Sequence, residues 1–219
     1  MENESESSSL QIVHTELYND LEYIHKVLVQ SNIKYWLVGG SLLGQVRGTI
    51  LQSQGKKYTP GIIPWDDDID IGINVYDIHL VKKKLAEDSN YSVRVSEHGL
   101  KLKHKTSKVG IDIFGYKSVI SYHHNSLKDI CRQLVENNVT IWILASEVSR
   151  TAWPRDYFLY EEICEVINVP FGPTNSFIPV RPMRYLNTVY GDNCMTVGKR
   201  EFNHIENKLH PNAGIDFAL

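Results

Sequence analysis

Ten residues in the first half of the chain decide the fold: Ile63-Pro64-Trp65-Asp66-Asp67-Asp68-Ile69-Asp70-Ile71-Gly72. Side chains along a β-strand alternate between two faces. Asp66, Asp68 and Asp70 are therefore predicted to share one face, while Ile69 and Ile71 enter a core. Carboxylates two residues apart lie roughly 6–7 Å apart on a strand that rises about 3.3 Å per residue. Because such close like charges repel and raise one another's pKa, the pattern predicts a divalent cation site rather than a solvated acidic run.

A second acidic strand supports this prediction. Asp112 lies within Ile111-Asp112-Ile113-Phe114, inside a strand-like run over Val109–Tyr116. An aspartate on a core strand needs a partner. If the two acidic strands are neighbours, Asp112 joins the group as a metal ligand and takes the proton from an attacking hydroxyl. The alternative is a buried aspartate satisfied by backbone donors. Oxygen ligands favour Mg²⁺ or Mn²⁺, with coordination positions left for substrate phosphates.

A glycine turn precedes the acidic run. A short apolar strand over Tyr35–Val38 leads into Gly39-Gly40-Ser41, and a brief helix follows over Leu42–Arg47. Small residues let the backbone approach a phosphate, and amides at a helix N-terminus supply donors and positive potential. Gly39, Gly40 and Ser41 are therefore candidate substrate-binding residues. Arg47 could reach a phosphate or another anionic group of the substrate, or it could pair with one of the aspartates.

The hydrophobic spacing predicts an α/β (α+β) protein with a mixed sheet flanked by helices and a mostly helical C-terminal part. Trp36, Trp142 and Trp153 are interpreted as core residues, and Tyr190 and Asp192 as residues that cap and pack the last helix. The predicted helices cover Leu10–Gln30, Asp77–Asp88, most of Ser118–Arg155, and Met183–Tyr190 between Pro182 and Gly191. The further predicted strands cover Ile62–Ile73, Tyr91–Ser96 and Leu100–Thr106, with a hairpin of Ile163–Val169 and Ser176–Val180.

Length and composition set the broad class. The chain has 219 residues and a net charge of −3 with mixed signs, so nothing indicates a nucleic-acid partner. Residues 1–9 are predicted to be a disordered tail, and residues 10–219 one domain with a core over 10–116 and an elaboration over 117–219. Three widely spaced cysteines, without a signal peptide or an apolar run of about 20 residues, predict a cytoplasmic protein without a membrane anchor.

The motifs together resemble a known family. A strand, a Gly-Gly-Ser turn entering a helix, alternating aspartates and a further aspartate on another strand are similar to the nucleotidyltransferase superfamily. Three stretches are similar to the LicD/fukutin family in particular, and the long gap from Ser41 to Asp68 is typical of that family. These stretches are Gly39-Gly40-Ser41-Leu42-Leu43-Gly44-Gln45-Val46-Arg47, Ile63 to Asp70, and Ile111 to Phe114. Phe171-Gly172, Ile178-Pro179-Val180 and Tyr185 to Asp192 resemble its C-terminal part.

The resemblance implies transfer of a phosphorylated alcohol, such as phosphocholine or ribitol phosphate, from a CDP-linked donor to a glycan hydroxyl. Asp66, Asp68, Asp70 and Asp112 would hold Mg²⁺ or Mn²⁺, with Asp68, Asp70 and Asp112 as the catalytic residues. Gly40 and Ser41 would hold the donor phosphates. The first alternative is a nucleotidyltransferase that attaches a nucleoside monophosphate to a small molecule, sugar or protein. The second is an inactive binding module of the same fold.

Overall fold

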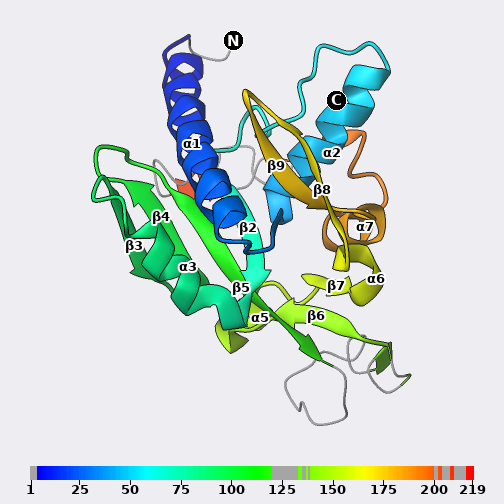
Figure 1. The fold of residues 1–219 in the computed structure, drawn as a ribbon. Coiled ribbons are helices and arrows are strands. Elements are labelled where there is room, and N and C mark those ends of the chain that lie inside the picture. Colours follow the sequence, from blue (N-terminus) through cyan, green and yellow to red (C-terminus); the bar gives the residue numbers. More distant parts are fainter. Residues whose placement is uncertain are drawn as a thin grey trace.

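A mixed sheet of seven strands organises the protein, as the computed structural model shows (Figure 1). The structure describes residues 4–119, 133–134, 137, 139–199, 202–203, 208–209 and 216–219. Within these residues the helical segments are α1 (Glu4–Gln30), α2 (Gly39–Ser53), η1 (Val75–Asp77), α3 (Ile78–Leu85), α5 (Glu147–Ala152), α6 (Tyr160–Ile163) and α7 (Met183–Tyr190). The main-sheet strands are β1 (Tyr35–Leu37), β2 (Ile69–Asn74), β3 (Tyr91–Val95), β4 (Gly99–His104), β5 (Ile111–Val119), β6 (Ile141–Leu144) and β7 (Tyr157–Leu159).

The strand order of this sheet is β1-β2-β5-β4-β3, and β6 and β7 extend it from the far half of β5. β2 and β5 run parallel, whereas each of the other described pairs in this sheet is antiparallel. The predicted fold class, a mixed sheet flanked by helices, is therefore confirmed. The remaining strands form three small two-stranded sheets: β8 (Val166–Phe171) with β9 (Thr174–Pro179), β10 (Val197–Gly198) with β13 (Phe217–Ala218), and β11 (Phe202–Asn203) with β12 (Lys208–Leu209).

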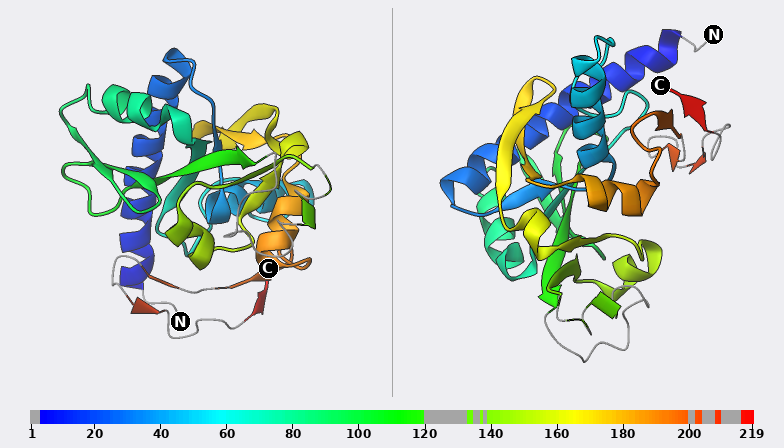
Figure 2. Two further views of the ribbon diagram at one scale, coloured as in Figure 1. Left: turned by 90° about the horizontal axis from the view of Figure 1, so that it is seen from below. Right: turned by 90° about the vertical axis from the view of Figure 1, so that its right-hand side faces the viewer.

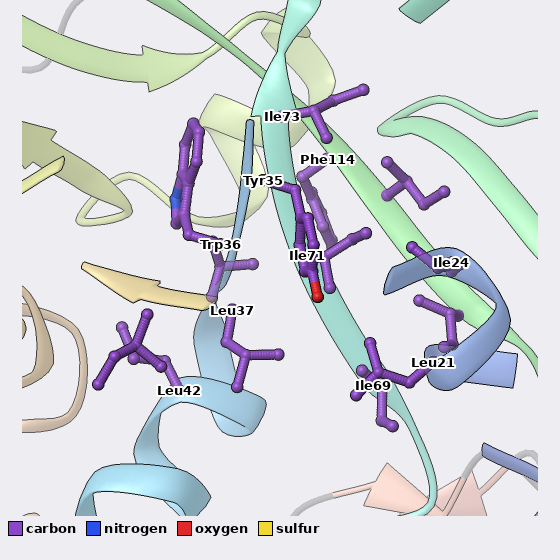
Figure 3. Close-up of a cluster of buried hydrophobic side chains, with 14 of the residues drawn as sticks. Leu21, Ile24, Tyr35, Trp36, Leu37, Leu42, Ile69, Ile71, Ile73 and Phe114 are labelled. Carbon is purple, nitrogen blue, oxygen red and sulfur yellow. The ribbon is translucent and has the colours of Figure 1, made fainter. Parts of the chain in front are cut away.

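One face of the sheet is an aliphatic core. α1 and α3 lie side by side across it (Figure 1). Leu21 and Ile24 of α1 face Ile69 and Ile71 of β2 (Figure 3), and all four side chains are fully buried. Burying a leucine or isoleucine contributes about 1.5–3 kcal/mol. The isoleucines that alternate with the aspartates therefore fix which face of β2 turns inward, as predicted.

The opposite face is lined by aromatic side chains. Trp36 projects from the side of β1 opposite to α1 (Figure 3) and packs against Tyr116 and Phe158. Gly72 makes room for this cluster, because a Cβ there would lie 2.9 Å from the Trp36 ring. Asp70 shares this face of β2 because it lies two residues before Gly72.

Helix α2 is longer than predicted and begins at Gly39 rather than Leu42. Strand β2 is shorter and begins at Ile69 rather than Ile62, so Asp66 and Asp68 precede the strand. Pro64 explains part of this difference, because proline removes a backbone donor and is poorly tolerated inside a sheet.

Two observations concern the predicted division of the chain, which stays a prediction. Helix α1 begins at Glu4, so residues 4–9 are helical where a tail was expected; glutamate is a good helix former, and acidic residues favour a first turn. The boundary expected after residue 116 falls inside β5, which continues to Val119 and pairs there with β6.

The prediction of a mostly helical C-terminal part is also wrong for the described residues. Within the described part of residues 118–155, β6 occupies Ile141–Leu144, and the longest helix is α5 over Glu147–Ala152. A run of Ile-Trp-Ile-Leu has the β-branched and aromatic composition of a buried strand, and this preference decided its structure. Residues 120–132 of the predicted helical stretch lie outside the described residues.

The hairpin and the last helix are confirmed. β8 and β9 pair antiparallel around Gly172, and α7 covers Met183–Tyr190 with Gly191 directly after it. The C-terminal strand β13, red in Figure 2, lies near the end of α2, where the Lys56 ammonium donates to the carbonyl of Leu219 at 2.7 Å.

Candidate active site

Asp70 and Asp112 lie side by side in the sheet. They are register partners on the parallel strands β2 and β5, and neighbouring strands are about 4.8 Å apart. Both carboxylates therefore emerge from the face opposite α1. The two acidic strands are therefore neighbours, which is the condition under which Asp112 was expected to join the other acids.

Asp66 and Asp68 join this pair from the loop before β2. Burial, followed by repulsion from Asp68 and Asp112, raises the pKa of Asp70 well above its usual value. Burial and repulsion from Asp68 likewise raise the pKa of Asp66. The four carboxylates thus gather, as predicted. The prediction placed Asp66, Asp68 and Asp70 on one strand. Only Asp70 lies on β2, and the loop before β2 carries Asp66 and Asp68.

The glycine turn lies directly against these carboxylates. Gly39 has a φ of +55°, and a Cβ there would lie 3.2 Å from Oδ2 of Asp70. A Cβ on Gly40 would lie 2.9 Å from Oδ2 of Asp66. The predicted proximity of glycines and acids is therefore present, and it leaves no room for larger side chains. Ser41 is buried, and its hydroxyl accepts a hydrogen bond from the backbone amide of Asp70 at 2.9 Å, so this hydroxyl ties α2 to β2.

Arg47 contacts backbone carbonyls of the segment after α7. Its guanidinium is buried and donates from Nε and Nη2 to the carbonyl of Cys194 at 2.9 and 2.6 Å, and from Nη2 to the carbonyl of Val197 at 3.2 Å. Burial lowers its pKa. Arg47 therefore anchors the segment after α7 to α2, and its role as a substrate-binding residue stays a prediction.

Lys101 lies beside the acids and was not identified from the sequence. It is the register partner of Asp112 on β4, and its ammonium lies 2.8 Å from Oδ2 of that carboxylate. Arg94 is in turn the register partner of Lys101 on β3. One row across four strands therefore reads Arg94, Lys101, Asp112 and Asp70. The predicted strand over Leu100–Thr106 contains Lys101, but the order of the strands was needed to identify its partner.

A buried hydrogen-bonded network supports the glycine turn and was also missed. Asp156 accepts hydrogen bonds from the hydroxyls of Tyr116 at 2.6 Å and Tyr185 at 3.0 Å. The hydroxyl of Tyr185 in turn accepts from the amide of Gly39 at 3.1 Å. Burial raises the pKa of Asp156 to about 6. Tyr190, expected only to pack the last helix, has its hydroxyl near the acids: burial, and then Asp70 and Asp66, raise its pKa.

Replacing Tyr185 with Phe tests this support. The change leaves the Gly39 amide and one oxygen of Asp156 without a partner, and a buried polar group left unpaired costs about 1–3 kcal/mol. We expect the free energy of unfolding, measured by urea denaturation, to fall by that amount. Tyr160→Phe, a change at an exposed tyrosine, is the control. Equal stability of the two variants would contradict the role given to Tyr185.

The carboxylates have the chemistry of a Mg²⁺ or Mn²⁺ site, because hard cations prefer carboxylate oxygens. Their mutual repulsion and the small residues beside them fit such an ion. In the side-chain arrangement that the structure describes, however, no three His, Cys, Asp or Glu residues could hold a metal ion together, and Asp112 is paired with Lys101. The metal site over Asp66, Asp68, Asp70 and Asp112 therefore stays a prediction.

A sequence model described as "LicD/FKTN/FKRP, nucleotidyltransferase domain" matches residues 32–179, more than half of the chain. The chain belongs to the LicD/FKTN/FKRP family. The predicted resemblance is thereby confirmed. The matched residues of the LicD/FKTN/FKRP domain include the glycine turn, all four carboxylates and Asp156, whereas Tyr185 and Tyr190 lie beyond them.

Two curated relatives align with most of this chain. An uncharacterized protein of Rickettsia prowazekii (strain Madrid E) is 30% identical over 176 residues, which cover 80% of this chain and 53% of the relative. One of Rickettsia typhi (strain ATCC VR-144 / Wilmington) is 28% identical over 180 residues, 80% of this chain and 45% of the relative. The chain thus spans about half the length of these two curated relatives.

Two further similarities are more limited. Mouse and human ribitol 5-phosphate transferase FKRP are each 43% identical over 56 residues, 26% of this chain and 9% of the relative. Among solved structures, lincosamide antibiotic adenylyltransferase LnuA with bound lincomycin aligns with a TM-score of 0.39 and 18% identity, covering 74% of this chain and 78% of that one. Within the described part of the LicD/FKTN/FKRP chain, no helix combines the length and apolar character needed to cross a membrane.

The raised pKa values predict how the stability of the metal-free protein depends on pH. A carboxyl with a raised pKa in the folded state contributes stability that is complete below its unfolded pKa and is lost as pH rises through the folded pKa. For Asp156 this window runs from 3.8 to about 6, and the loss has an upper bound of about 3 kcal/mol. We expect urea denaturation to show lower stability at pH 7.5 than at pH 5.

Magnesium provides the control for this pH experiment. If the carboxylates bind Mg²⁺, the ion stabilises the folded state at pH 7.5 more than at pH 5, because protons compete with it. A protein that is more stable at pH 7.5 than at pH 5 without metal would contradict the assignment of raised pKa values to this cluster.

Proposed function

We propose that this protein transfers a phosphorylated alcohol, such as phosphocholine or ribitol phosphate, from a CDP-linked donor to a hydroxyl of a glycan, in a reaction that requires Mg²⁺ or Mn²⁺. One observation carries the proposal: Asp70 and Asp112 are register partners on adjacent parallel strands, and Gly39 lies directly beside Asp70, in a member of the LicD/FKTN/FKRP family. The similarity to proteins named ribitol 5-phosphate transferase supports the kind of group transferred. A cytoplasmic location remains part of the proposal.

The reaction makes one bond to phosphorus and breaks another. The acceptor hydroxyl oxygen attacks the phosphorus that carries the alcohol, the bond from that phosphorus to the bridging oxygen breaks, and CMP leaves with the bridging oxygen. Asp112 takes the proton of the attacking hydroxyl. Gly39 and Gly40 let the donor diphosphate approach the backbone at the start of α2, where amide groups favour negative charge.

Positioning and electrostatic stabilisation account for most of the rate acceleration in phosphoryl transfer. Asp66, Asp68, Asp70 and Asp112 would hold the cation, which supplies positive charge to the phosphoryl oxygens when bound. Lys101 keeps the carboxylate of Asp112 beside Asp70 through their ion pair. Tyr185 holds the Gly39 amide in place and is therefore a positioning residue.

The description of the family model as a nucleotidyltransferase domain supports a second candidate. Such an enzyme would attach a nucleoside monophosphate to a small molecule, sugar or protein and release pyrophosphate. The same carboxylates serve both reactions, and the two differ in which phosphorus is attacked. An inactive binding module is disfavoured because all four carboxylates are present and gathered.

One assay separates these functions. The protein is incubated with Mg²⁺ or Mn²⁺ and, in parallel reactions, CDP-choline, CDP-ribitol, CDP-glycerol or CTP, together with glycan acceptors. Metal-dependent release of CMP from a CDP-alcohol supports the proposal, whereas pyrophosphate from CTP supports the alternative. A thermal shift with one CDP-alcohol identifies the donor without turnover, since a ligand of the native state raises apparent stability. Neither product nor thermal shift with any of these compounds would refute both transfer reactions.

A further inference from the structure

Trp153 is an exposed ring beside the candidate active site. It was expected in the core, yet 42% of the residue is exposed. Its ring packs edge-on against Phe114 and His98, with ring centroids 5.6 and 4.9 Å apart. His98 is fixed by a hydrogen bond between Nδ1 and the hydroxyl of Ser149 at 3.0 Å, and Phe114 is buried. The indole is thus held from one side and open to solvent on the other.

This ring lies on the same face of the sheet as the acids. Phe114 is two residues after Asp112 on β5, so both side chains emerge from one face. Along a strand that separation is about 6–7 Å. Trp153 contacts Phe114 directly, and Asp156, three residues later, is hydrogen-bonded to Tyr116 of the same strand. The turn from Trp153 to Asp156 therefore lies over the acidic face.

The strand order separates a donor side from an acceptor side. In the order β1-β2-β5-β4, the glycine turn follows β1 and contacts Asp70 of β2. Trp153 contacts Phe114 of β5 and His98, the residue just before β4. Donor phosphates at the glycine turn and a ligand on Trp153 would therefore lie on opposite sides of Asp112, the residue that receives the acceptor's proton.

We propose that the exposed face of Trp153 is a platform for a sugar ring of the acceptor, next to the hydroxyl that Asp112 deprotonates. Sugar rings present C–H groups on their faces, which pack well against the electron-rich face of an aromatic ring. A pre-fixed indole also binds with little loss of side-chain freedom. This inference rests on the proposed transferase function, because it assigns the acceptor of that reaction.

Tryptophan fluorescence tests binding without any turnover. Trp153 is more exposed than the other three tryptophans, since Trp36 is buried and Trp65 and Trp142 are partly buried. The protein is titrated with methyl glycosides of glucose, galactose, mannose and N-acetylgalactosamine, and separately with CMP. We expect a saturable emission change with at least one glycoside, and its loss in Trp153→Phe. If no glycoside responds, or if only CMP produces a change that Trp153→Phe removes, the inference is wrong.

Kinetics with an active acceptor provide the second test. Trp153→Ala is expected to raise the KM for the acceptor by about 3- to 10-fold, as the loss of one aromatic contact would, with kcat and the KM for the CDP-linked donor within twofold. Tyr76→Ala is the matched control, because Tyr76 is an 82% exposed aromatic residue in η1, and Val75 of η1 packs against Gly115 on the α1 face of β5.

Two results would overturn the inference here while leaving the transferase proposal intact: an unchanged acceptor KM in Trp153→Ala, or a rise in the donor KM instead. Absence of turnover with every CDP-linked donor would refute the proposed transferase function. The fluorescence titration would still decide whether Trp153 binds sugars in that case, so the two failures are distinguishable.

Discussion

Replacing Asp70 with Asn is expected to reduce metal-dependent transfer by at least about a thousandfold, while raising the melting temperature of the metal-free protein. Activity is lost because a carboxylate required for the cation is gone, and electrostatic stabilisation is commonly the largest catalytic term. Stability rises because burial and the repulsion from Asp68 and Asp112, which raise the pKa of Asp70, no longer act on a charged group. The measurements are CMP release and thermal unfolding without metal.

The opposite signs of these effects distinguish a functional residue from a structural one. Asp112→Asn is expected to lose activity as well, without a comparable gain in stability, because it also breaks the ion pair with Lys101. Asp192→Asn, at an exposed aspartate after α7, is the control and should change neither quantity. If Asp70→Asn kept the parent's activity, the assignment of this cluster as an active site would fail.

Replacing Gly44 with Ala is expected to destabilise the protein by about 3 kcal/mol or more, although alanine normally stabilises a helix interior relative to glycine by about 0.5–1 kcal/mol. A Cβ at Gly44 would lie 2.3 Å from the carbonyl oxygen of Gly61 and 3.1 Å from the side chain of Ile63. Backbone cannot yield as a flexible side chain does, so α2 and the loop must separate. Urea denaturation measures the loss.

Gly55→Ala is the matched control for this prediction. Gly55 has a φ of +77°, and no neighbouring heavy atom lies within 4 Å of the position that a Cβ would take there, so alanine meets only the backbone strain of about 1 kcal/mol. The loop that Gly44 contacts leads directly to Asp66, and α2 carries the glycine turn at its start. We therefore expect Gly44→Ala to impair activity even below its melting temperature. Equal stability of the two variants would show that the close approach at Gly44 does not constrain the fold.

The residues that sequence analysis placed correctly share a local cause. The alternation of Ile69, Asp70 and Ile71 separates an apolar face from an acidic face of the strand, independently of the rest of the chain. Asp112 lies in the same pattern between Ile111 and Ile113. The gathering of the acids could be predicted because close carboxylates repel one another. Such repulsion destabilises a fold unless a bound cation offsets it. The acidic pattern extends backward through Asp68 and Asp66, but β2 begins only at Ile69. Pro64 disfavours a strand at the start of the pattern.

The rest depended on pairings between distant segments. Lys101 reaches Asp112 because β4 is the neighbour of β5, and no spacing in the sequence states that order. In the sequence, the residues around Asp156 are charged and aromatic and indicate only an ordinary turn. Tyr116 and Tyr185 are brought to Asp156 by the fold. The contacts of Arg47 could not be predicted for a similar reason, since its partners are backbone carbonyls about 150 residues away.

The two acids sit at the second position of β2 and of β5, the one parallel pair among the described strands of the main sheet. Everything that joins these strands, from η1 through the β3–β4 hairpin, comes after one acid and before the other along the chain. That crossover can change in length or composition while the spacing of the acids is kept by the ladder itself. An engineered chimaera could therefore exchange parts of this crossover to alter which molecules are accepted, provided that β4 keeps Lys101, the ion-pair partner of Asp112. The spacing of the two acids is then inherited unchanged.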